Sequence, residues 1–391
     1  MVKEHIVLNS PERFLGKHEI SKEKLIRAAE KATDKLEFIT KRDGSLFPGT
    51  CSVNFRYIRG ENKNWEAGMY TGCFWLAYEL TGNKFFKEVA ESHFDSYVER
   101  FEAKRGLGGH DVGFPYMPSV VAQYKITGDE RARDLALDVA NFFIGNAYKS
   151  QGEYKFIKRG GAEYRTMMDT LMNATLLLWA GKESENEYLT EAGLNQSRTT
   201  EKYLIREDGS SFHHFMFNPE DCSPIKGLTA QGNSDDSCWS RGHSWGVYGL
   251  PIAYSYTGAD FLPPLHKDIT YFMLNHLPED NIPYWDYDFT EGNELRDASA
   301  ACISACGMLE MANCLNNNSE EVTIFRNAAA KMLESVIDLC ADEPFEYDGL
   351  IRKVTHAKPQ GQGFDECAVY GDFFYLEALA RYILPDFKRY W

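Results

Sequence analysis

Two kinds of helical hydrophobic pattern alternate along the chain. In one kind, apolar residues occupy nearly every face, with frequent Gly and Ala; in the other, charged residues cover one face and apolar residues recur at helical spacing on the opposite face. The first kind predicts helices at residues 66–80, 114–126, 167–180, 241–256, 298–315 and 366–382. The second predicts helices at residues 21–40, 84–101, 130–145, 185–204, 261–277 and 320–341. A helix that is apolar on all sides is buried, so the first set should lie inside the second.

A glycine-containing turn follows most of the buried segments and marks a repeat. The clearest copies read Ala77–Asn83, Gln123–Asp129, Leu177–Lys182 and Ala253–Ala259, and weaker copies end near Asn316 and Tyr382. A glycine just past the last helical turn adopts the left-handed conformation that closes a helix. Gly82, Gly128, Gly181 and Gly258 should therefore each end a helix. The repeated unit is a helical hairpin.

Six such hairpins can close into a ring. The sequence thus predicts an all-α fold, a six-hairpin (α/α)6 barrel that forms one domain over residues 1–391, with residues 1–18 as an N-terminal arm. An open solenoid is the alternative, but its ends would need polar capping repeats, which we do not find in the sequence. The aromatic segment Tyr284–Tyr287 fits short strands or rim loops and does not indicate a second domain.

Composition and charge narrow the possible partners. Hydrophobic residues make up 43% of the chain, charged residues 26% and aromatic residues 14%, which is typical of a globular protein with a large core. The formal net charge of −16 repels phosphate backbones and anionic membranes, so neither nucleic acid nor a membrane is an expected partner. If the substrate is an anion, a few basic groups must capture it at short range inside a pocket.

Local composition predicts the cellular location of the protein and the state of its cysteines. The chain has no uninterrupted apolar stretch of about 18 residues, and Met1–Ile6 does not lead into a cleavable hydrophobic run, so we expect a cytoplasmic protein. Its nine cysteines are an odd number without framework spacing. Cys302, Cys306 and Cys314 fall in one helical segment, where reduced thiols that pack as small apolar residues are favoured over a metal cluster. We expect no metal and no cofactor.

The starts of the buried helices carry the candidate chemistry. Inner helices of a closed ring run parallel, so their N-termini converge on one mouth of the barrel. Four consecutive hairpins bring two carboxylates, a cation and indole rings to this mouth, among them Trp65, His110, Asp111, Asp169, Arg241 and Trp245. Arg241 and Trp245 stand one turn apart on a single helix face.

The two carboxylates allow a structural and a catalytic interpretation. Helix N-capping alone would justify Asp111 and Asp169. Asp169, however, lies in the apolar string Met167–Met172, where burying a carboxylate costs several kcal/mol without compensation. Two carboxylates that face each other raise the pKa of one of them, which makes it an acid near neutral pH. Because helix N-termini oppose this shift, the acid should be the more deeply buried carboxyl group.

Indole rings beside paired carboxylates indicate a sugar, since flat aromatic faces stack on the C–H faces of pyranose rings. Each residue also has a plainer interpretation: the tryptophans as core, Arg241 in a salt bridge to a rim carboxylate, and His213 as a buried structural histidine. The adjacent His213 and His214 are not a metal motif, because neighbouring side chains in an extended segment point to opposite faces. Neither a phosphate-binding glycine loop after a strand nor a nucleophile elbow is present. The sequence therefore favours a carbohydrate-active barrel.

Several motifs, in order and at compatible intervals, resemble one known family. They are His110–Phe114, Met168–Asn173, Gln231–Gly232 followed by Asp235–Trp245, and Val369–Phe373. In this combination the chain resembles the unsaturated glucuronyl hydrolases of glycoside hydrolase family 88 over nearly its whole length. The resemblance implies a six-hairpin α/α barrel, in agreement with the helix pattern.

The resemblance also implies a reaction. Members of the family act on the oligosaccharides that polysaccharide lyases leave, whose nonreducing uronic acid carries a C4=C5 double bond. By this resemblance Asp169 protonates C4 and helps water add at C5, while Asp111 holds the ring hydroxyls and keeps Asp169 in its acid form. The residues implied in binding the uronate are His110, His213, Gln231, Arg241 and Trp245, with Trp65 and Tyr370 stacking on the sugar or bordering it.

The segment Gly349–Lys358 departs from the pattern of streptococcal-like members, in which a loop with Ser and Lys contacts a sulfate. Here the serines are replaced, whereas Arg352, Lys353 and Lys358 remain. We hypothesise that this loop, through Lys358, holds the second sugar, with or without a sulfate; a solvated charged loop is the alternative.

The expected substrates are unsaturated disaccharides of the chondroitin or hyaluronan type. An unsaturated rhamnogalacturonyl hydrolase with a pectin-derived substrate, a non-catalytic sugar-binding barrel and a structural repeat protein are the alternatives, and the oligomeric state stays open.

Overall fold

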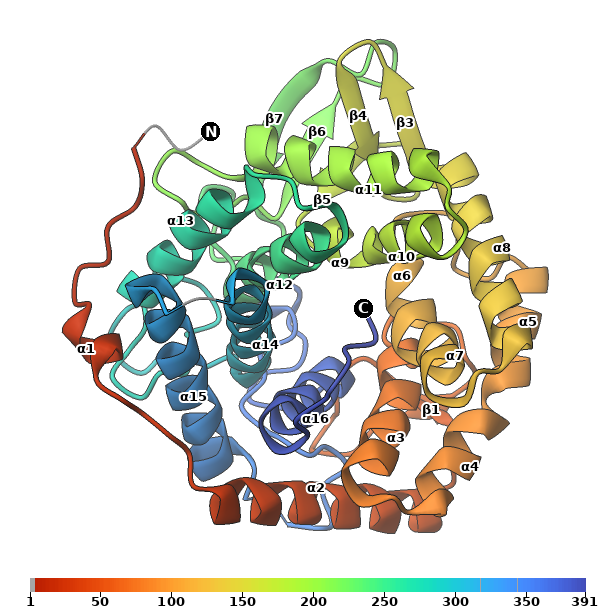
Figure 1. Ribbon diagram of the computed structural model, residues 1–391, viewed down its shortest axis with the longest axis vertical. Helices are drawn as coiled ribbons and strands as arrows, with labels where there is room; N and C mark the ends of the chain where they lie inside the picture. Colours follow the sequence, from red (N-terminus) through yellow and green to blue (C-terminus); the bar gives the residue numbers. More distant parts are fainter. Residues whose placement is uncertain (1–3, 317, 343) are drawn as a thin grey trace.

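The inner helices form the wall of a ring. The computed structural model describes residues 4–316, 318–342 and 344–391. The inner wall comprises α3 (Ala67–Thr81), α6 (Gly113–Tyr116) continued by η1 (Met117–Val121) and α7 (Ala122–Thr127), α9 (Thr170–Asn173) with α10 (Thr175–Glu183), α12 (Ser240–Thr257), α14 (Ala298–Leu315) and α16 (Val369–Ile383). The second inner helix contains a π-helical turn, where Pro118 has no N–H to donate. The ring closes where α16 packs against α3 (Figure 1).

The amphipathic helices cover the inner set from outside. They are α2 (Lys22–Asp43), α4 (Lys84–Ser92) with α5 (Phe94–Glu102), α8 (Glu130–Ala147), α11 (Glu187–Thr199) with η2 (Thr200–Leu204), α13 (Leu262–Asn275) and α15 (Glu320–Cys340) (Figure 1). The predicted (α/α)6 barrel is therefore confirmed. Residues 4–18 run along the outside with the short helix α1 (Glu12–Leu15), where the Asn327 amide donates to the carbonyl of Phe14 at 2.8 Å. Residues 1–3 of the expected arm lie outside the described residues.

Glycine ends three of the inner helices as predicted. Gly82, Gly128 and Gly258 follow α3, α7 and α12 with φ of 69°, 72° and 64°. The prediction for Gly181 is wrong, because this residue lies inside α10, which continues to Glu183. A Cβ at Gly181 would stand 2.2 Å from the Thr190 hydroxyl, so glycine is needed there for the close approach of α11.

Short strands connect the helices at the rim. β1 (Phe47–Pro48) pairs with β2 (Arg59–Gly60), and β3 (Tyr148–Gln151) pairs with β4 (Tyr154–Ile157). An antiparallel sheet joins β5 (Tyr164–Met167), β6 (His214–Phe217) and β7 (Pro224–Leu228), with Met167 opposite His214. The third inner helix was predicted to begin at Met167, but this residue ends β5. The aromatic segment after Pro283 makes isolated bridges at the rim, from Tyr284 to Arg296 and from Asp286 to Trp239, as expected.

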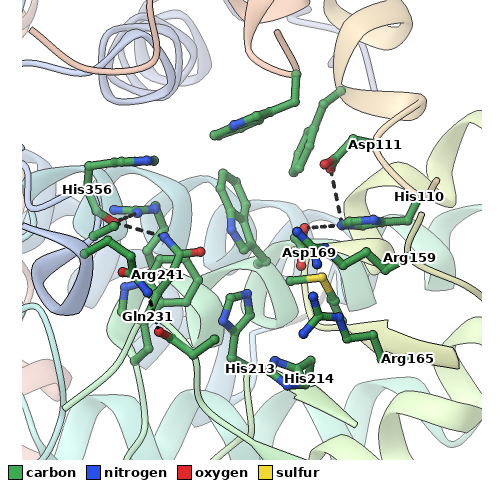
Figure 2. Close-up of a pocket in the computed structure, with 18 of the residues that line it drawn as sticks. His110, Asp111, Arg159, Arg165, Asp169, His213, His214, Gln231, Arg241 and His356 are labelled. Carbon is green, nitrogen blue, oxygen red and sulfur yellow. Dashed lines mark hydrogen bonds and ion pairs between the residues drawn. The ribbon is translucent and has the colours of Figure 1, made fainter. Parts of the chain in front are cut away.

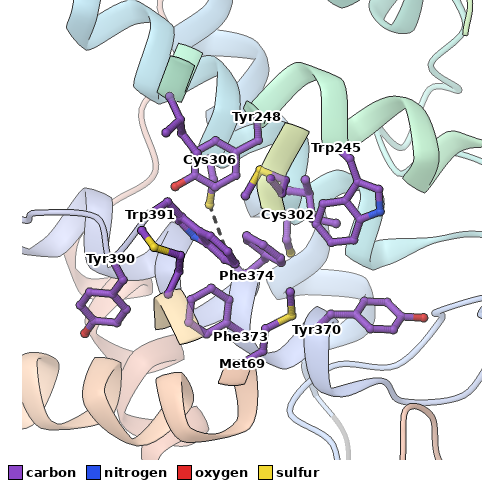
Figure 3. Packing of buried hydrophobic residues seen from close by; sticks show 14 of the residues in the cluster. Met69, Trp245, Tyr248, Cys302, Cys306, Tyr370, Phe373, Phe374, Tyr390 and Trp391 are labelled. Carbon is purple, nitrogen blue, oxygen red and sulfur yellow. Dashed lines mark hydrogen bonds between the residues drawn. The ribbon is translucent and has the colours of Figure 1, made fainter. Parts of the chain in front are cut away.

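Aromatic side chains fill the centre of the barrel (Figure 3). The ring of Trp391 lies nearly parallel to that of Phe374, which in turn contacts Trp245. All nine cysteines are free thiols, and Cys302 and Cys306 are buried on α14, in agreement with a packing role. Among the described residues α14 is also the one helix long and apolar enough to cross a membrane, yet 83% of it is buried inside the barrel. An inner helix of this ring is expected to have that character.

Candidate active site

A cavity of about 370 Å³ opens at the mouth where the inner helices begin (Figure 2). It is lined by side chains from the segments before α6 and α9, from β5 and β6, from the start of α12 and from the segment after Thr355. The residues expected at the site that line it are Trp65, His110, Asp111, Asp169, His213, Gln231, Arg241 and Trp245. The convergence predicted from the helix starts is therefore present.

His110 lies between the two carboxylates. Its Nε2 is 2.8 Å from Oδ2 of Asp169 and 3.3 Å from Oδ1 of Asp111 (Figure 2). The Asp169 side chain is 13% exposed and that of Asp111 35%, so Asp169 is the more deeply buried of the pair. The second carboxylate oxygen of Asp169, Oδ1, is buried and has no hydrogen-bond partner in the protein. An acceptor left unpaired beside a cavity is available to a ligand.

Asn173 holds the two carboxylate segments together. Its Oδ1 accepts from the backbone N–H of Phe114 at 2.9 Å, and its Nδ2 donates to the Asp169 carbonyl at 3.2 Å and to Asp111 at 3.4 Å. Gly113 allows this approach, because a Cβ there would stand 2.3 Å from the Asn173 carbonyl oxygen. Helix capping does not explain the acids, since Asp169 precedes α9 without a capping hydrogen bond and Val112, not Asp111, precedes α6.

The position of His110 sets the protonation of the site. Burial alone would lower the pKa of His110, but Asp111 and Asp169 outweigh it and raise this pKa to about 9. Burial raises the pKa of Asp111. Burial also acts to raise the pKa of Asp169, but the protonated His110 beside it leaves this pKa below its ordinary value. The expectation that the more buried carboxyl has the raised pKa is therefore wrong for the cavity without ligand, where His110 carries the proton.

The same three side chains are the one group among the described residues with metal-ligand geometry, because their ligand atoms lie within 4.8 Å of one another. A metal ion requires the unprotonated imidazole nitrogen. At neutral pH the raised pKa of His110 keeps a proton on this ring. The absence of a metal cofactor stays a prediction.

The sheet brings the two adjacent histidines to the cavity. Met168 donates its backbone N–H to the His213 carbonyl at 3.0 Å, directly before Asp169. Burial lowers the pKa of His213 to about 3, so its ring is neutral, and it packs against Trp239 with ring centroids 4.6 Å apart. Nδ1 of His213 and both ring nitrogens of His214 are buried and unpartnered in the protein.

Arg241 has the salt bridge that was the alternative to a substrate contact. Its Nη1 donates to Oδ2 of Asp297 at 2.6 Å and to the Thr355 carbonyl at 2.8 Å, and its Nη2 donates to the carbonyl of His356. Trp239 and Tyr370 lie against the guanidinium at 4.5 Å and 4.6 Å. The cation thus fixes the backbone of the 355–356 segment beside the cavity.

Two expected binding residues do not line the cavity. Tyr370 is fully buried behind Trp65, whose ring lies 5.4 Å away at an interplanar angle of 20°, so it supports the indole, and its place beside the sugar stays a prediction. Lys358 pairs with Glu294 at 2.6 Å, and its ammonium lies 4.7 Å from the Trp285 ring. The role of Lys358 in holding a second sugar stays a prediction.

Arg159 and Arg165 line the cavity and were missed by sequence reasoning. Arg159 lies in the turn between β4 and β5, and Arg165 lies in β5; the sequence pattern did not resolve either strand. The signal available in the sequence was Gly160–Gly161 between two basic residues, which is weak by itself. His356, whose Nδ1 is 3.1 Å from the Tyr370 hydroxyl, was also missed.

Comparison with known proteins shows which family and which solved structures the chain is similar to. The Glycosyl Hydrolase Family 88 model matches residues 49–341. An unsaturated chondroitin disaccharide hydrolase of Streptococcus pneumoniae is 37% identical over 391 aligned residues, which cover 98% of each chain. The crystal structure of an unsaturated glucuronyl hydrolase from Streptococcus agalactiae matches with a TM-score of 0.95 and 33% identity over 100% of both chains. A mutant of that enzyme complexed with dGlcA-GalNAc6S matches with a TM-score of 0.89 and 32% identity, over 100% of this chain and 99% of the other.

The barrel, its carboxylate-lined cavity and these relatives define a glycoside hydrolase. The chain belongs to glycoside hydrolase family 88. The resemblance stated from the sequence motifs is confirmed at this level.

Proposed function

We propose that the protein releases the nonreducing 4,5-unsaturated uronic acid from lyase-generated disaccharides of the chondroitin or hyaluronan type. The observation that carries this proposal is the contact of His110 with Asp169, whose other oxygen is unpartnered beside the cavity. The names of the relatives, an unsaturated chondroitin disaccharide hydrolase and an unsaturated glucuronyl hydrolase, support the substrate class. The cavity of about 370 Å³ is large enough for a sugar ring.

The proton needed for the reaction starts on His110. A uronate that enters the cavity adds negative charge close to Asp169, which raises the pKa of this carboxyl group. The proton then crosses the 2.8 Å hydrogen bond from Nε2 of His110 to Asp169. Asp111, 3.3 Å from the same nitrogen, stabilises the histidine cation until this transfer.

Asp169 next acts on the double bond. It donates its proton to C4, and the ring oxygen stabilises the positive charge that forms at C5. A water molecule adds to C5 and gives its proton to the Asp169 carboxylate. The resulting hemiketal opens by breaking the bond from C5 to the ring oxygen, C5 becomes a ketone, and the former anomeric carbon expels the second sugar. Because cleavage is indirect, carboxylate separation does not predict retention or inversion here.

The remaining lining residues bind and orient the sugar. The indoles of Trp65 and Trp245 present apolar faces, and Phe114 packs between them at centroid distances of 5.2 Å and 5.1 Å. On the other side, Gln231 donates to the His356 carbonyl at 3.2 Å, so the two segments at this edge hold each other. His213 supplies a neutral polar group beside Asp169.

The test is a panel of lyase-generated disaccharides that differ in linkage and in sulfate position. Hydrolysis removes the double bond, so loss of its ultraviolet absorbance reports turnover. Turnover of chondroitin or hyaluronan disaccharides, with little turnover of the pectin-derived disaccharide, supports the proposal. Preference for the pectin-derived disaccharide would make the protein a rhamnogalacturonyl hydrolase, and binding without turnover of any member would make it a sugar-binding barrel.

A further inference from the structure

The positive charge available to an anionic substrate is confined to one edge of the cavity. Arg241 is neutralised by Asp297, with both side chains at most 1% exposed. The histidines at the cavity other than His110 are neutral, because burial lowers the pKa of His213 and His356 to about 3 and also lowers that of His214. Apart from His110, which is paired with Asp111 and Asp169, the cations that line the cavity and remain available are Arg159 and Arg165.

The environment of these two arginines leaves them open to a ligand. Among the described residues Arg159 has no ion pair or side-chain hydrogen bond. Arg165 pairs with Glu163 at 3.2 Å, but that carboxylate is 57% exposed, and Nε of Arg165 is buried without a partner. A surface ion pair of this kind is weak and exchanges readily for a better anion.

His214 supplies a third polar group at the same edge. It is 3% exposed, it lines the cavity, and neither ring nitrogen has a partner in the protein (Figure 2). A buried imidazole without any hydrogen bond costs free energy unless a ligand or water satisfies it. Its neutral ring can donate one hydrogen bond to an anion that the arginines hold.

The backbone fixes this edge beside the reacting groups. Arg159 donates its N–H to the carbonyl of Arg165 at 2.8 Å, which holds the two residues across the turn. Gly160 in that turn packs on Gly109, where a Cβ would stand 2.4 Å from the Gly160 nitrogen. Gly109 directly precedes His110, so the arginine turn is clamped to the segment that carries His110 and Asp111.

We propose that Arg159, Arg165 and His214 form an oxyanion subsite for the unsaturated sugar itself, at the edge of the cavity opposite Arg241. This inference rests on the proposed function. The bound oxyanion is either the uronate carboxylate, which every substrate has, or a sulfate ester on the same ring. Guanidinium groups suit both, because their paired N–H groups match the geometry of carboxylate and sulfate oxygens.

The experiment compares Arg159→Gln, Arg165→Gln and the double variant on three disaccharides: unsulfated, sulfated on the unsaturated sugar, and sulfated on the second sugar. Loss of a charge-assisted hydrogen bond should lower kcat/KM roughly 10- to 100-fold, mainly through KM. A loss on all three assigns the uronate carboxylate, and a loss confined to the second assigns a sulfate on that ring. The salt dependence of kcat/KM should fall in the same variants.

Arg131→Gln is the matched control, because this arginine is 75% exposed on α8 and forms its ion pair with Asp129, away from the cavity. Thermal unfolding of each variant, together with Arg159→Lys and Arg165→Lys, separates binding from misfolding, since lysine keeps the charge. Unchanged kcat/KM on all three disaccharides, or a loss limited to sulfate on the second sugar, overturns the inference. If the unaltered protein hydrolyses none of them, the proposed function fails instead.

Discussion

The guanidinium of Arg241 is bound to the carboxylate of Asp297 at 2.6 Å in the interior, although the two residues are 56 positions apart in the chain. Asp297 also accepts hydrogen bonds from the N–H groups of Ser299 and Ala300 at the start of α14. One carboxylate thereby joins the start of α14 to the start of α12 and, through Arg241, to the 355–356 segment. The pair organises the wall of the cavity, whatever it contributes to binding.

Asp297→Asn should strongly destabilise the fold. It leaves the Arg241 charge buried without compensation, and breaking one partner of a buried pair typically costs about 3–5 kcal/mol. Urea denaturation measures the change. Glu294→Gln is the control, because it breaks the partly exposed pair with Lys358 and should cost about 1 kcal/mol or less. Equal effects of the two substitutions would contradict the structural role of Arg241.

Asp169→Asn should abolish turnover but preserve binding. The amide cannot protonate C4 or accept the proton of water, and acid–base assistance contributes about 10²- to 10⁴-fold, with a larger loss where one group serves both steps. Single-turnover absorbance and calorimetric titration with an unsaturated disaccharide measure the two effects. Asp236→Asn, on the exposed loop before α12, should change neither. Substantial residual turnover in Asp169→Asn would assign the acid elsewhere.

Activity should fall as the pH rises through about 9. The reaction uses the proton on His110, whose pKa the two carboxylates raise to about 9, so this proton is lost above that value. In His110→Gln the alkaline fall should disappear and kcat should be low at every pH. A profile of kcat/KM against pH for both proteins checks this, because kcat/KM reports the pKa values of the enzyme without substrate. An alkaline limb that persists unchanged in His110→Gln would exclude the histidine as its source.

The same group should make folding stability pH-dependent. Its pKa in the folded state lies above the ordinary value of 6.5, so its stabilising contribution is complete below about pH 6.5 and vanishes as the pH rises through about 9. The difference in unfolding free energy between the unaltered protein and His110→Gln should therefore shrink between pH 6 and pH 10. A constant difference would mean that the histidine is uncharged in the folded protein.

Gly109→Ala should lower kcat/KM at least about tenfold, whereas Gly108→Ala should not. A methyl group at residue 109 would collide with the backbone of Gly160, so the segment that carries His110 must move away from the arginine turn. At residue 108 a Cβ has no heavy atom within 4 Å. Kinetics of the two variants on one disaccharide make the comparison, since both introduce the same side chain. Similar kinetics would mean that the packing of Gly109 on Gly160 does not position the site.

Lys358 and Glu294 should affect sulfate selectivity in opposite directions if Lys358 holds the second sugar. Lys358→Ala removes the cation, whereas Glu294→Gln releases it from its partner. The ratio of kcat/KM for disaccharides with and without sulfate on the second sugar measures the effect. A ratio unchanged in both variants would mean that the loop is only a solvated charged segment.

Helices were predictable from the sequence because the inner ones are apolar on every face. The segment 298–315, for example, was predicted with the bounds that α14 has. The strand β5 was not predictable, because four residues are too few to show an alternating hydrophobic pattern. The pairing of Met167 with His214 also depends on residues far along the chain.

The site was predictable where a residue begins an inner helix and not where distant segments meet. Asp111 lies two residues before α6 and Asp169 directly before α9, so ring closure brings them together. The pairing of Arg241 with Asp297 and the packing of Gly160 on Gly109 depend on tertiary contacts that no local pattern records. For the same reason the pKa of Asp169 was expected in the wrong direction, since it depends on where the His110 ring lies.

The ring closes only when α16, the last inner helix of the chain, packs against α3, the first. The walls of its cavity come from hairpins spread over most of the chain, and no single hairpin encloses a sugar. A nascent chain that still lacks its last inner helix therefore has its acids without a finished pocket around them. We therefore expect hydrolytic activity only from a chain long enough to close the ring.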